Sequence, residues 1–255
     1  MAIQGDLAQI LSGMPIRVAG CNIAVTQPTI REISAYGEDS FLGGLQILVK
    51  TDKIIAPIKE GNSRLAMLSD FQVLIAALEN DTSMKEAVDN LFSLIFPDYS
   101  WEFAPGSINF RIGENKSIIG QINPMNFENL QNTLDTLFLP QRGDKEEEFK
   151  PANSAAEEIA KKLQKGREQR AELQRKEKGD MGSIFANYTS VLSIGLSMDI
   201  NILYGYTPFQ LYDAFTRYAA KMAYDLHMKV STTPFMDTSE MKDPKNWLEN
   251  LYTNL

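Results

Sequence analysis

The sequence has a single cysteine, Cys21, and a single histidine, His227, among its 255 residues. A disulfide needs two cysteines, and a Cys/His zinc site or an iron–sulfur cluster needs several such ligands, so one copy of this chain can form none of them. A Cys–His or Ser–His catalytic dyad would have to use His227. Most metal and thiol chemistry is therefore excluded at the outset.

Long apolar runs and the common catalytic motifs are also missing. The longest apolar stretches, such as Phe71–Leu78 and Ser190–Leu196, are far shorter than the roughly 20 residues that a membrane span needs. There is no Gly-rich phosphate loop, no G-x-G-x-x-G and no G-x-S-x-G nucleophile motif. We expect a soluble, intracellular, non-enzymatic protein without a cofactor or a membrane partner. An enzyme with a carboxylate metal site stays open as an alternative, although nothing in the sequence marks one.

Positive charge is scarce over the chain as a whole. The 25 Lys and Arg residues face 33 Asp and Glu residues, which gives a net charge of −8. A basic field for nucleic acid is therefore missing, and the sequence does not favour a nucleic-acid partner. A homo-oligomer remains open.

One segment differs from the rest in its density of charge. Residues 144–178 contain ten Lys or Arg and nine Asp or Glu, so this segment carries +1 and leaves −9 for the remainder. Ala, Glu, Lys, Gln and Arg favour helix, and Ser154 is placed to cap one. We predict an N-terminal α+β domain over 1–140, a charged helical linker over 141–180 and a small all-α domain over 181–255. The linker's basic residues leave open a second interpretation, a surface for an acidic partner or for nucleic acid.

The N-terminal part has patterns of both helix and hairpin, and the predicted fold class is α+β, mostly α-helical. We expect a short helix at Leu7–Leu11 and a small hairpin within Pro15–Val25 that turns near Gly20. The other expected elements are a helix opened by Pro28 with Thr26 as cap and ended at Tyr36-Gly37, a helix at Glu38–Lys50, one helix or two over Asn62–Leu78, a helix at Thr82–Phe96, a hairpin of Ser107–Ile112 with Ser117–Ile122, and a helix capped by Asn126 that runs to Phe138.

The C-terminal part is predicted to be helical. Ser183 leads into a helix over Phe185–Ile194, and Ser197 is placed to cap a helix over Met198–Leu203. Thr207, Pro208 and Gln210 form a capping-box pattern that opens a helix to about Lys229. A short amphipathic terminal helix with Trp247, Leu248 and Leu251 is expected to dock on its own domain. His227 is expected on the surface near the end of the long helix.

Two stretches resemble a known family. The first contains Gln27-Pro-Thr-Ile-Arg-Glu-Ile33 and Tyr36-Gly-Glu38, and it is similar to the N-terminal region of tail-assembly proteins of phages that infect Gram-positive bacteria. The second contains Ile194-Gly-Leu-Ser197, Asp199 and Tyr206-Thr-Pro-Phe-Gln-Leu211. It resembles the C-terminal helical segment of the long, two-domain form of phage tail assembly chaperones.

The resemblance implies a function and partners. It implies a non-enzymatic chaperone in the host cytoplasm whose N-terminal domain binds the tape measure protein and whose second domain recruits tail tube subunits. The long form in that family usually arises by ribosomal frameshift. A structural virion protein of the tail, baseplate or connector is the alternative. The residues that we expect to bind partners are apolar or aromatic: Ile30, Ile33, Phe41, Tyr206, Phe209, Tyr212, Trp247 and Leu251.

Overall fold

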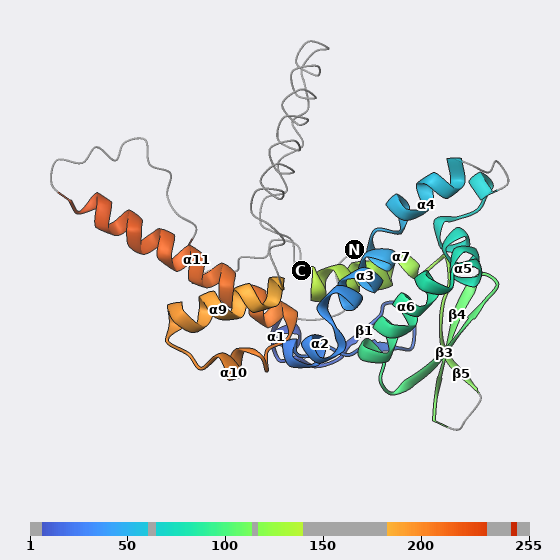
Figure 1. Cartoon of the computed structure of the whole chain (residues 1–255), viewed down its shortest axis with the longest axis horizontal. Coiled ribbons are helices and arrows are strands. Elements are labelled where there is room, and N and C mark those ends of the chain that lie inside the picture. The colour runs from blue at the N-terminus through green and yellow to red at the C-terminus, as the bar shows by residue number, and fades with distance from the viewer. Residues whose placement is uncertain (1–6, 61–64, 114–116, 140–182, 234–245, 249–255) are drawn as a thin grey trace, which may run out of the picture.

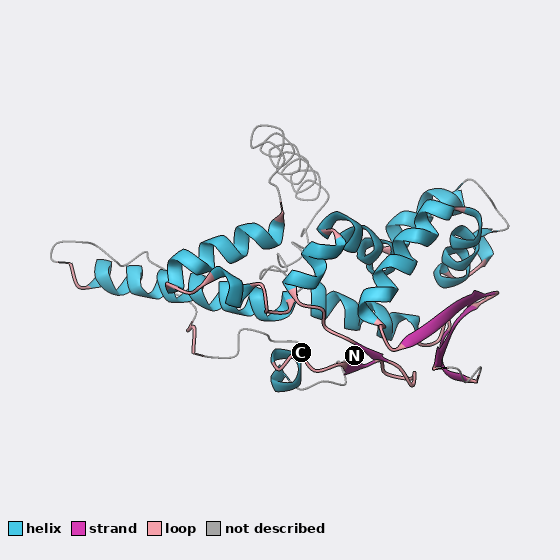
Figure 2. Ribbon diagram, turned by 60° about the horizontal axis from the view of Figure 1, so that its bottom comes forward, coloured by secondary structure: helices cyan, strands magenta, loops and turns pink. Residues whose placement is uncertain are grey.

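The protein forms an elongated array of helices with a small antiparallel sheet at one end and a long helix at the other (Figure 1). The computed structural model describes residues 7–60, 65–113, 117–139, 183–233 and 246–248. The elements before the sheet are α1 (Leu7–Leu11), β1 (Ile16–Arg17), β2 (Ala24–Val25), α2 (Ile30–Tyr36), α3 (Glu38–Val49), α4 (Thr51–Glu60), η1 (Leu65–Met67), α5 (Asp70–Asn80) and α6 (Thr82–Ile95). The sheet and later helices are β3 (Tyr99–Ala104), β4 (Ser107–Ile112), β5 (Ile118–Ile122), α7 (Phe127–Phe138), α9 (Ile184–Leu196), α10 (Ile200–Leu203) and α11 (Pro208–Ser231). The predicted fold class, α+β and mostly helical, is confirmed (Figure 2).

Side-chain caps fix where several of these helices begin. Thr29 caps α2 and forms a capping box with Glu32. The prediction that Thr26 is this cap was therefore wrong. Thr29, which is followed three residues later by Glu32, satisfies the first backbone N–H groups of α2 instead. Ser69 and Gln72 form the same motif at the start of α5. Because α5 begins at Asp70, the predicted helical region over 62–78 resolves into η1 and a separate α5.

Helices α3 and α6 pack closely at a glycine. A Cβ atom placed on Gly44 would lie 2.4 Å from the carbonyl oxygen of Ala87 and 2.9 Å from the Cβ of Leu91. Nothing lies within 4 Å of a Cβ placed on the neighbouring Gly43. Of the two adjacent glycines, only Gly44 allows this close approach of the helices.

Helix α4 was not predicted. It contains Pro57, which removes a backbone donor inside the helix, and only Thr51 and Ile55 are buried. Thr51 connects α4 to the preceding helix, because its hydroxyl donates to the carbonyl oxygens of Ile47 at 2.8 Å and Leu48 at 2.6 Å. Packing against its neighbours, rather than its sequence pattern, explains this helix.

The sheet has the strand order β3-β4-β5, and both pairs are antiparallel. The predicted hairpin is β4–β5, whereas β3 was missed. Aromatic side chains join this sheet to α6: the ring of Phe92 lies 5.6 Å from that of Trp101 and 5.8 Å from that of Phe110. Alternation along the strands places Trp101 and Phe110 on the same face, since they are paired in the register.

The predicted N-terminal hairpin is confirmed as β1 and β2, which pair Ile16 with Val25. It packs against β5, because a Cβ on Gly120 would lie 2.6 Å from Cγ2 of Ile23. Asn126 occupies the N-cap position of α7 as predicted, but its side chain makes no capping bond. Its amide nitrogen instead donates to the carbonyl oxygens of Gly20 at 3.0 Å and Gln121 at 2.9 Å, which ties the hairpin to β5.

The C-terminal helices agree with prediction except at one boundary. Ser183 caps α9, and the capping box of Thr207 and Gln210 opens α11. Ser197 was predicted to cap the next helix, but it adopts a left-handed conformation with φ 51° and ends α9. Asp199 is the N-cap of α10 instead, because its carboxylate accepts from the backbone N–H of Asn201. The predicted linker over 141–180, with Ser154, lies outside the described residues.

Buried residues from both predicted domains belong to one apolar cluster. It contains Ile33, Phe41 and Leu134 from the N-terminal part together with Leu203 and Leu211 from the C-terminal part. The proposed domain boundaries stay a prediction, and the described helices on either side of them pack together. Among the described residues, no helix combines the length and apolar character that crossing a bilayer demands.

Candidate partner-binding surface

The stretches 27–38 and 194–211 meet at the start of α2. The backbone N–H of Ile30 donates to the carbonyl oxygen of Tyr206 at 2.8 Å, and that of Arg31 donates to Tyr204 at 2.9 Å. These are the first two helical N–H groups, which lack partners inside a helix. The loop between α10 and α11 therefore completes the N-terminus of α2, and the Arg31 guanidinium adds a bond to the carbonyl oxygen of Asn201 at 3.2 Å.

Glu38 makes a second junction. It lies in the first turn of α3, and its Oε1 accepts from the backbone N–H of Ile184 at 2.7 Å, while its Oε2 accepts from the Ser183 hydroxyl. A carboxylate at a helix N-terminus satisfies unpaired N–H groups and the positive end of the helix dipole. Glu38 thus joins α3 to α9.

Gln210 makes a third junction. Its Oε1 accepts from the backbone N–H of Thr207 at 2.8 Å, and its Nε2 donates to the carbonyl oxygen of Leu11 at 2.6 Å. The Gln210 side chain therefore completes the capping box of α11 and also donates a hydrogen bond to a carbonyl oxygen at the end of α1. The three junctions place the C-terminal helices in a defined position on the N-terminal part.

The structure buries four of the eight residues that were predicted to bind partners. Ile30, Ile33, Phe41 and Phe209 are at most 1% exposed and belong to the core. Phe41, for example, packs edge-on against Phe138 at 5.4 Å. A partner cannot touch these side chains in this fold, because they are buried.

The other four predicted residues have different surroundings. Tyr206 and Tyr212 are half-buried, and Tyr212 packs on Tyr188 at 5.1 Å between α11 and α9. Trp247 is also half-buried, and its carbonyl oxygen accepts from Nη1 of Arg217 at 3.0 Å. This contact agrees with the prediction that the terminal segment docks on its own chain. Leu251 lies outside the described residues.

Exposed apolar side chains gather on the three C-terminal helices. Figure 1 shows that α11 extends beyond α9 and α10, so no described helix lies beside the distal half of α11. Ile194 on α9 is 80% exposed, because it lies two positions after the buried Leu192 and therefore on the other side of the helix. We call the following residues the C-terminal apolar surface: Val191, Ile194, Leu196, Ile200, Ile202, Met222, Leu226 and Met228.

The part of this surface on α9 and α10 is free of charge, because these two helices contain no charged residue. The part on α11 is mixed, since the exposed Lys221 and Lys229 lie next to Met222 and Met228 in the sequence. Two ion pairs join charges along α11: Asp213 pairs with Arg217 at 3.0 Å, and Lys221 pairs with Asp225 at 2.8 Å. The apolar side chains of α11 become more exposed along the helix: Leu211 is buried, Phe215 and Tyr218 are half-buried, and Met222 and Leu226 are exposed.

Helices α9 and α11 form a close pair beneath this surface. A Cβ placed on Gly195 would lie 2.4 Å from Cζ of Tyr218, and the rings of Tyr188 and Phe215 are 4.4 Å apart. Packing this tight leaves the outer sides of the pair as the part that can accept another molecule. Exposed apolar surface of this kind is typical of protein-binding sites.

The described residues contain no group of three His, Cys, Asp or Glu side chains arranged to hold a metal ion. Burial raises the pKa of the Cys21 thiol, which is half-buried beside β5, above its usual range. A thiol of this kind stays protonated at neutral pH and is a weak nucleophile. His227 is half-buried on α11, near the end of the helix as predicted.

Comparison of the chain with known protein families, with curated proteins and with solved structures gives no match. The fold and its surface therefore carry the functional argument. They define a mostly helical protein with exposed apolar side chains on its three C-terminal helices.

Most of this surface was not predicted from the sequence, because α9 has no charged side that would distinguish its solvent-facing residues from its buried ones. The signal was present in another form: residues 184–196 contain no charge at all, although a surface helix normally carries charges on its solvent side. A charge-free helix that packs on only one side leaves its apolar residues exposed.

Proposed function

We propose that this chain is a non-enzymatic phage tail assembly chaperone that binds the tape measure protein and recruits tail tube subunits. The observation that carries the proposal is the C-terminal apolar surface, which includes Ile194 and is held on the N-terminal part by Glu38 and Gln210. In this proposal, the surface binds the tail tube subunit. The resemblance of residues 23–49 and 192–217 to the family supplies the identity of the partners.

The chemistry of the surface supports a chaperone role. A chaperone covers apolar surface that its partner would otherwise expose to water, and burial of such surface on both sides drives association. Met222 and Met228 add flexible, polarisable side chains that adapt to the shape of a partner. The uncharged part of the surface, on α9 and α10, matches a subunit whose own contact surface is buried in the finished tail.

Co-expression tests the proposal. The chain should co-purify with the tape measure protein and the tail tube protein encoded in the same genome, from the host cytoplasm. A chain that captures neither partner, as the full-length protein at low salt, contradicts the proposal.

A structural protein of the tail, baseplate or connector is the second candidate, and it would use the same exposed surface. Quantitative mass spectrometry of purified virions separates the two. A chaperone is absent from mature particles, whereas a structural component is present in stoichiometric copies.

A further inference from the structure

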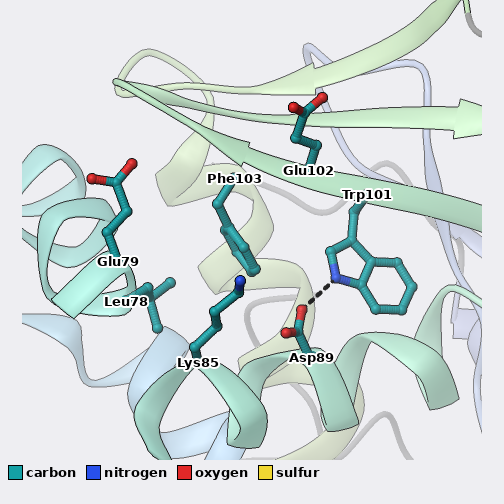
Figure 3. Close-up of a pocket in the computed structure, with 7 residues that line it drawn as sticks. All are labelled: Leu78, Glu79, Lys85, Asp89, Trp101, Glu102 and Phe103. Carbon is teal, nitrogen blue, oxygen red and sulfur yellow. Dashed lines mark hydrogen bonds between the residues drawn. The ribbon is translucent and has the colours of Figure 1, made fainter. Parts of the chain in front are cut away.

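A pocket lies at the opposite end of the molecule from the C-terminal apolar surface, between α5, α6 and β3 (Figure 3). It encloses about 300 Å³. Its lining residues are Leu78, Glu79, Lys85, Asp89, Trp101, Glu102 and Phe103. The proposed function does not use this pocket.

The aromatic wall of the pocket is held firmly in place. Trp101 and Phe103 point from β3 toward α6, as Figure 3 shows, and Phe92 packs against both rings at 5.6 and 6.2 Å. The indole N–H of Trp101 donates to Oδ1 of Asp89 at 2.7 Å. These contacts keep the rings in position whether or not a ligand is present.

Negative charge predominates around the rings. The lining has three carboxylates, Glu79, Asp89 and Glu102, and one ammonium, Lys85. Glu102 already pairs with Arg111 at 2.7 Å, and its side chain points to the opposite face of the strand. Glu79 and the second oxygen of Asp89 have no hydrogen-bond or ion-pair partner among the residues that the structure describes. Carboxylates beside an aromatic ring suit a cation.

The pocket also lies beside an open strand edge. β3 pairs only with β4 within the described residues, so it is an edge strand, and three consecutive residues of it line the pocket. An edge strand presents unpaired backbone N–H and C=O groups that an extended segment of another chain can pair with. A side chain of that segment would then enter the pocket.

We propose that this pocket binds a Lys or Arg side chain of an extended segment of a partner protein, which lies along the edge of β3. The cation packs on Trp101 and Phe103 and pairs with Glu79 and Asp89. Lys85 opposes the cation and limits the affinity, because like charges repel. The proposal is independent of the proposed function, since it concerns a different face of the molecule.

The test measures peptide binding to the full chain by the fluorescence of Trp101, in a Trp247→Phe background that leaves one tryptophan. The probe is a blocked eight-residue peptide that alternates Arg and Val, and the comparison peptide alternates Glu and Val. We expect the basic peptide alone to change the fluorescence, with an affinity that falls as salt is added.

Three variants separate the pocket from general attraction to an acidic protein. Glu79→Gln combined with Asp89→Asn should weaken binding about tenfold, and Lys85→Ala should strengthen it about threefold. Glu86→Gln removes one negative charge from α6, the helix that carries Asp89, at a position outside the lining, and should leave affinity within about twofold.

Three outcomes would overturn the proposal: no response of Trp101, equal binding of the acidic peptide, or equal effects of Glu86→Gln and the pocket variants.

The chain's own basic segment is the other occupant to test. If Trp101 responds to the peptide only after the eight Lys and Arg of residues 161–178 are changed to Gln, that segment rather than a partner fills the pocket.

Discussion

Single residues decide how closely the helices pack, and the neighbouring Gly43 and Gly44 show this most directly. Both lie on α3, but only Gly44 faces a close contact with α6. Two adjacent glycines within a helical stretch do not show which of them a close contact requires. The backbone of Ala87, which makes the contact, is more than 40 residues away in the chain, so no local pattern could identify it.

We predict opposite effects of alanine at these two positions. Gly44→Ala should lower the free energy of unfolding by about 1–3 kcal/mol, since the new methyl group pushes α3 away from the backbone of α6. Gly43→Ala should raise it by up to about 1 kcal/mol, because alanine favours helix and finds open space. Chemical denaturation measures both. Equal effects at the two positions would contradict this packing.

The thiol of Cys21 gives a prediction for pH. Its pKa is raised by burial, so the folded state disfavours the thiolate more than the unfolded state does. The contribution to stability is complete below the pKa of the unfolded thiol and is lost as the pH rises through about 8.5 and beyond. Stability measured from pH 7 to 10 should therefore fall less in Cys21→Ser than in the natural chain. An identical fall in both would contradict the burial effect.

At the scale of elements, helix ends join parts of the chain that are far apart in sequence. The capping boxes of α5 and α11 look alike in sequence, Ser69 with Gln72 and Thr207 with Gln210. Only Gln210 has a second partner in the structure, the carbonyl oxygen of Leu11. Sequence predicted the α11 box correctly, but its second role depends on where α1 lies.

The same substitution in the two boxes tests this difference. Gln72→Glu should change the free energy of unfolding by less than about 0.5 kcal/mol, because Glu completes a capping box as well as Gln does. Gln210→Glu should lower it by about 1–3 kcal/mol, because it replaces a donor with a carboxylate facing the carbonyl oxygen of Leu11. Denaturation curves of the two variants provide the comparison. Similar losses would show that the bond to α1 contributes nothing.

Glu38 offers a second test at this scale. Glu38→Ala should destabilise α9 by about 1–2 kcal/mol, since the N–H of Ile184 and the Ser183 hydroxyl lose their acceptor. Asp39→Ala is the control, because Asp39 lies in the same first turn of α3 but is exposed. Hydrogen exchange at Ile184 and Phe185 should accelerate only in Glu38→Ala. Acceleration in both variants would point to α3 rather than to the junction.

Other elements show which parts of the fold local sequence patterns predict and which they do not. An apolar stripe predicted α6, and a capping-box pattern predicted α11, because both signals are local. Helix α4 carries Pro57 inside it, which a sequence pattern treats as a helix breaker. Ser197 and Asp199 both suit a cap, and only the left-handed turn at Ser197 assigns that role to Asp199.

At the scale of the whole molecule, the sequence predicted apolar helices but not which apolar residues face outward. Ile30 and Ile33 lie in an apolar stripe of the sort that binds either a partner or the rest of the chain, and in this structure both are buried in the apolar cluster. Ile194 belongs to a helix without charge, so its exposure depends on which side of α9 meets α11. Long-range packing of this kind decides what remains for a partner.

The central claim is that the C-terminal apolar surface binds the tail tube subunit, and it is tested by the affinity of the full-length chain for that protein. We predict that Ile194→Gln weakens binding about tenfold or more, because an isoleucine side chain contributes about 1.5–3 kcal/mol when it is buried. Met125→Gln is the matched control, since Met125 is 93% exposed and lies outside this surface, before α7. It should leave the affinity unchanged. Equal affinity of the Ile194→Gln variant and the natural chain, or no binding by the natural chain, would contradict the account.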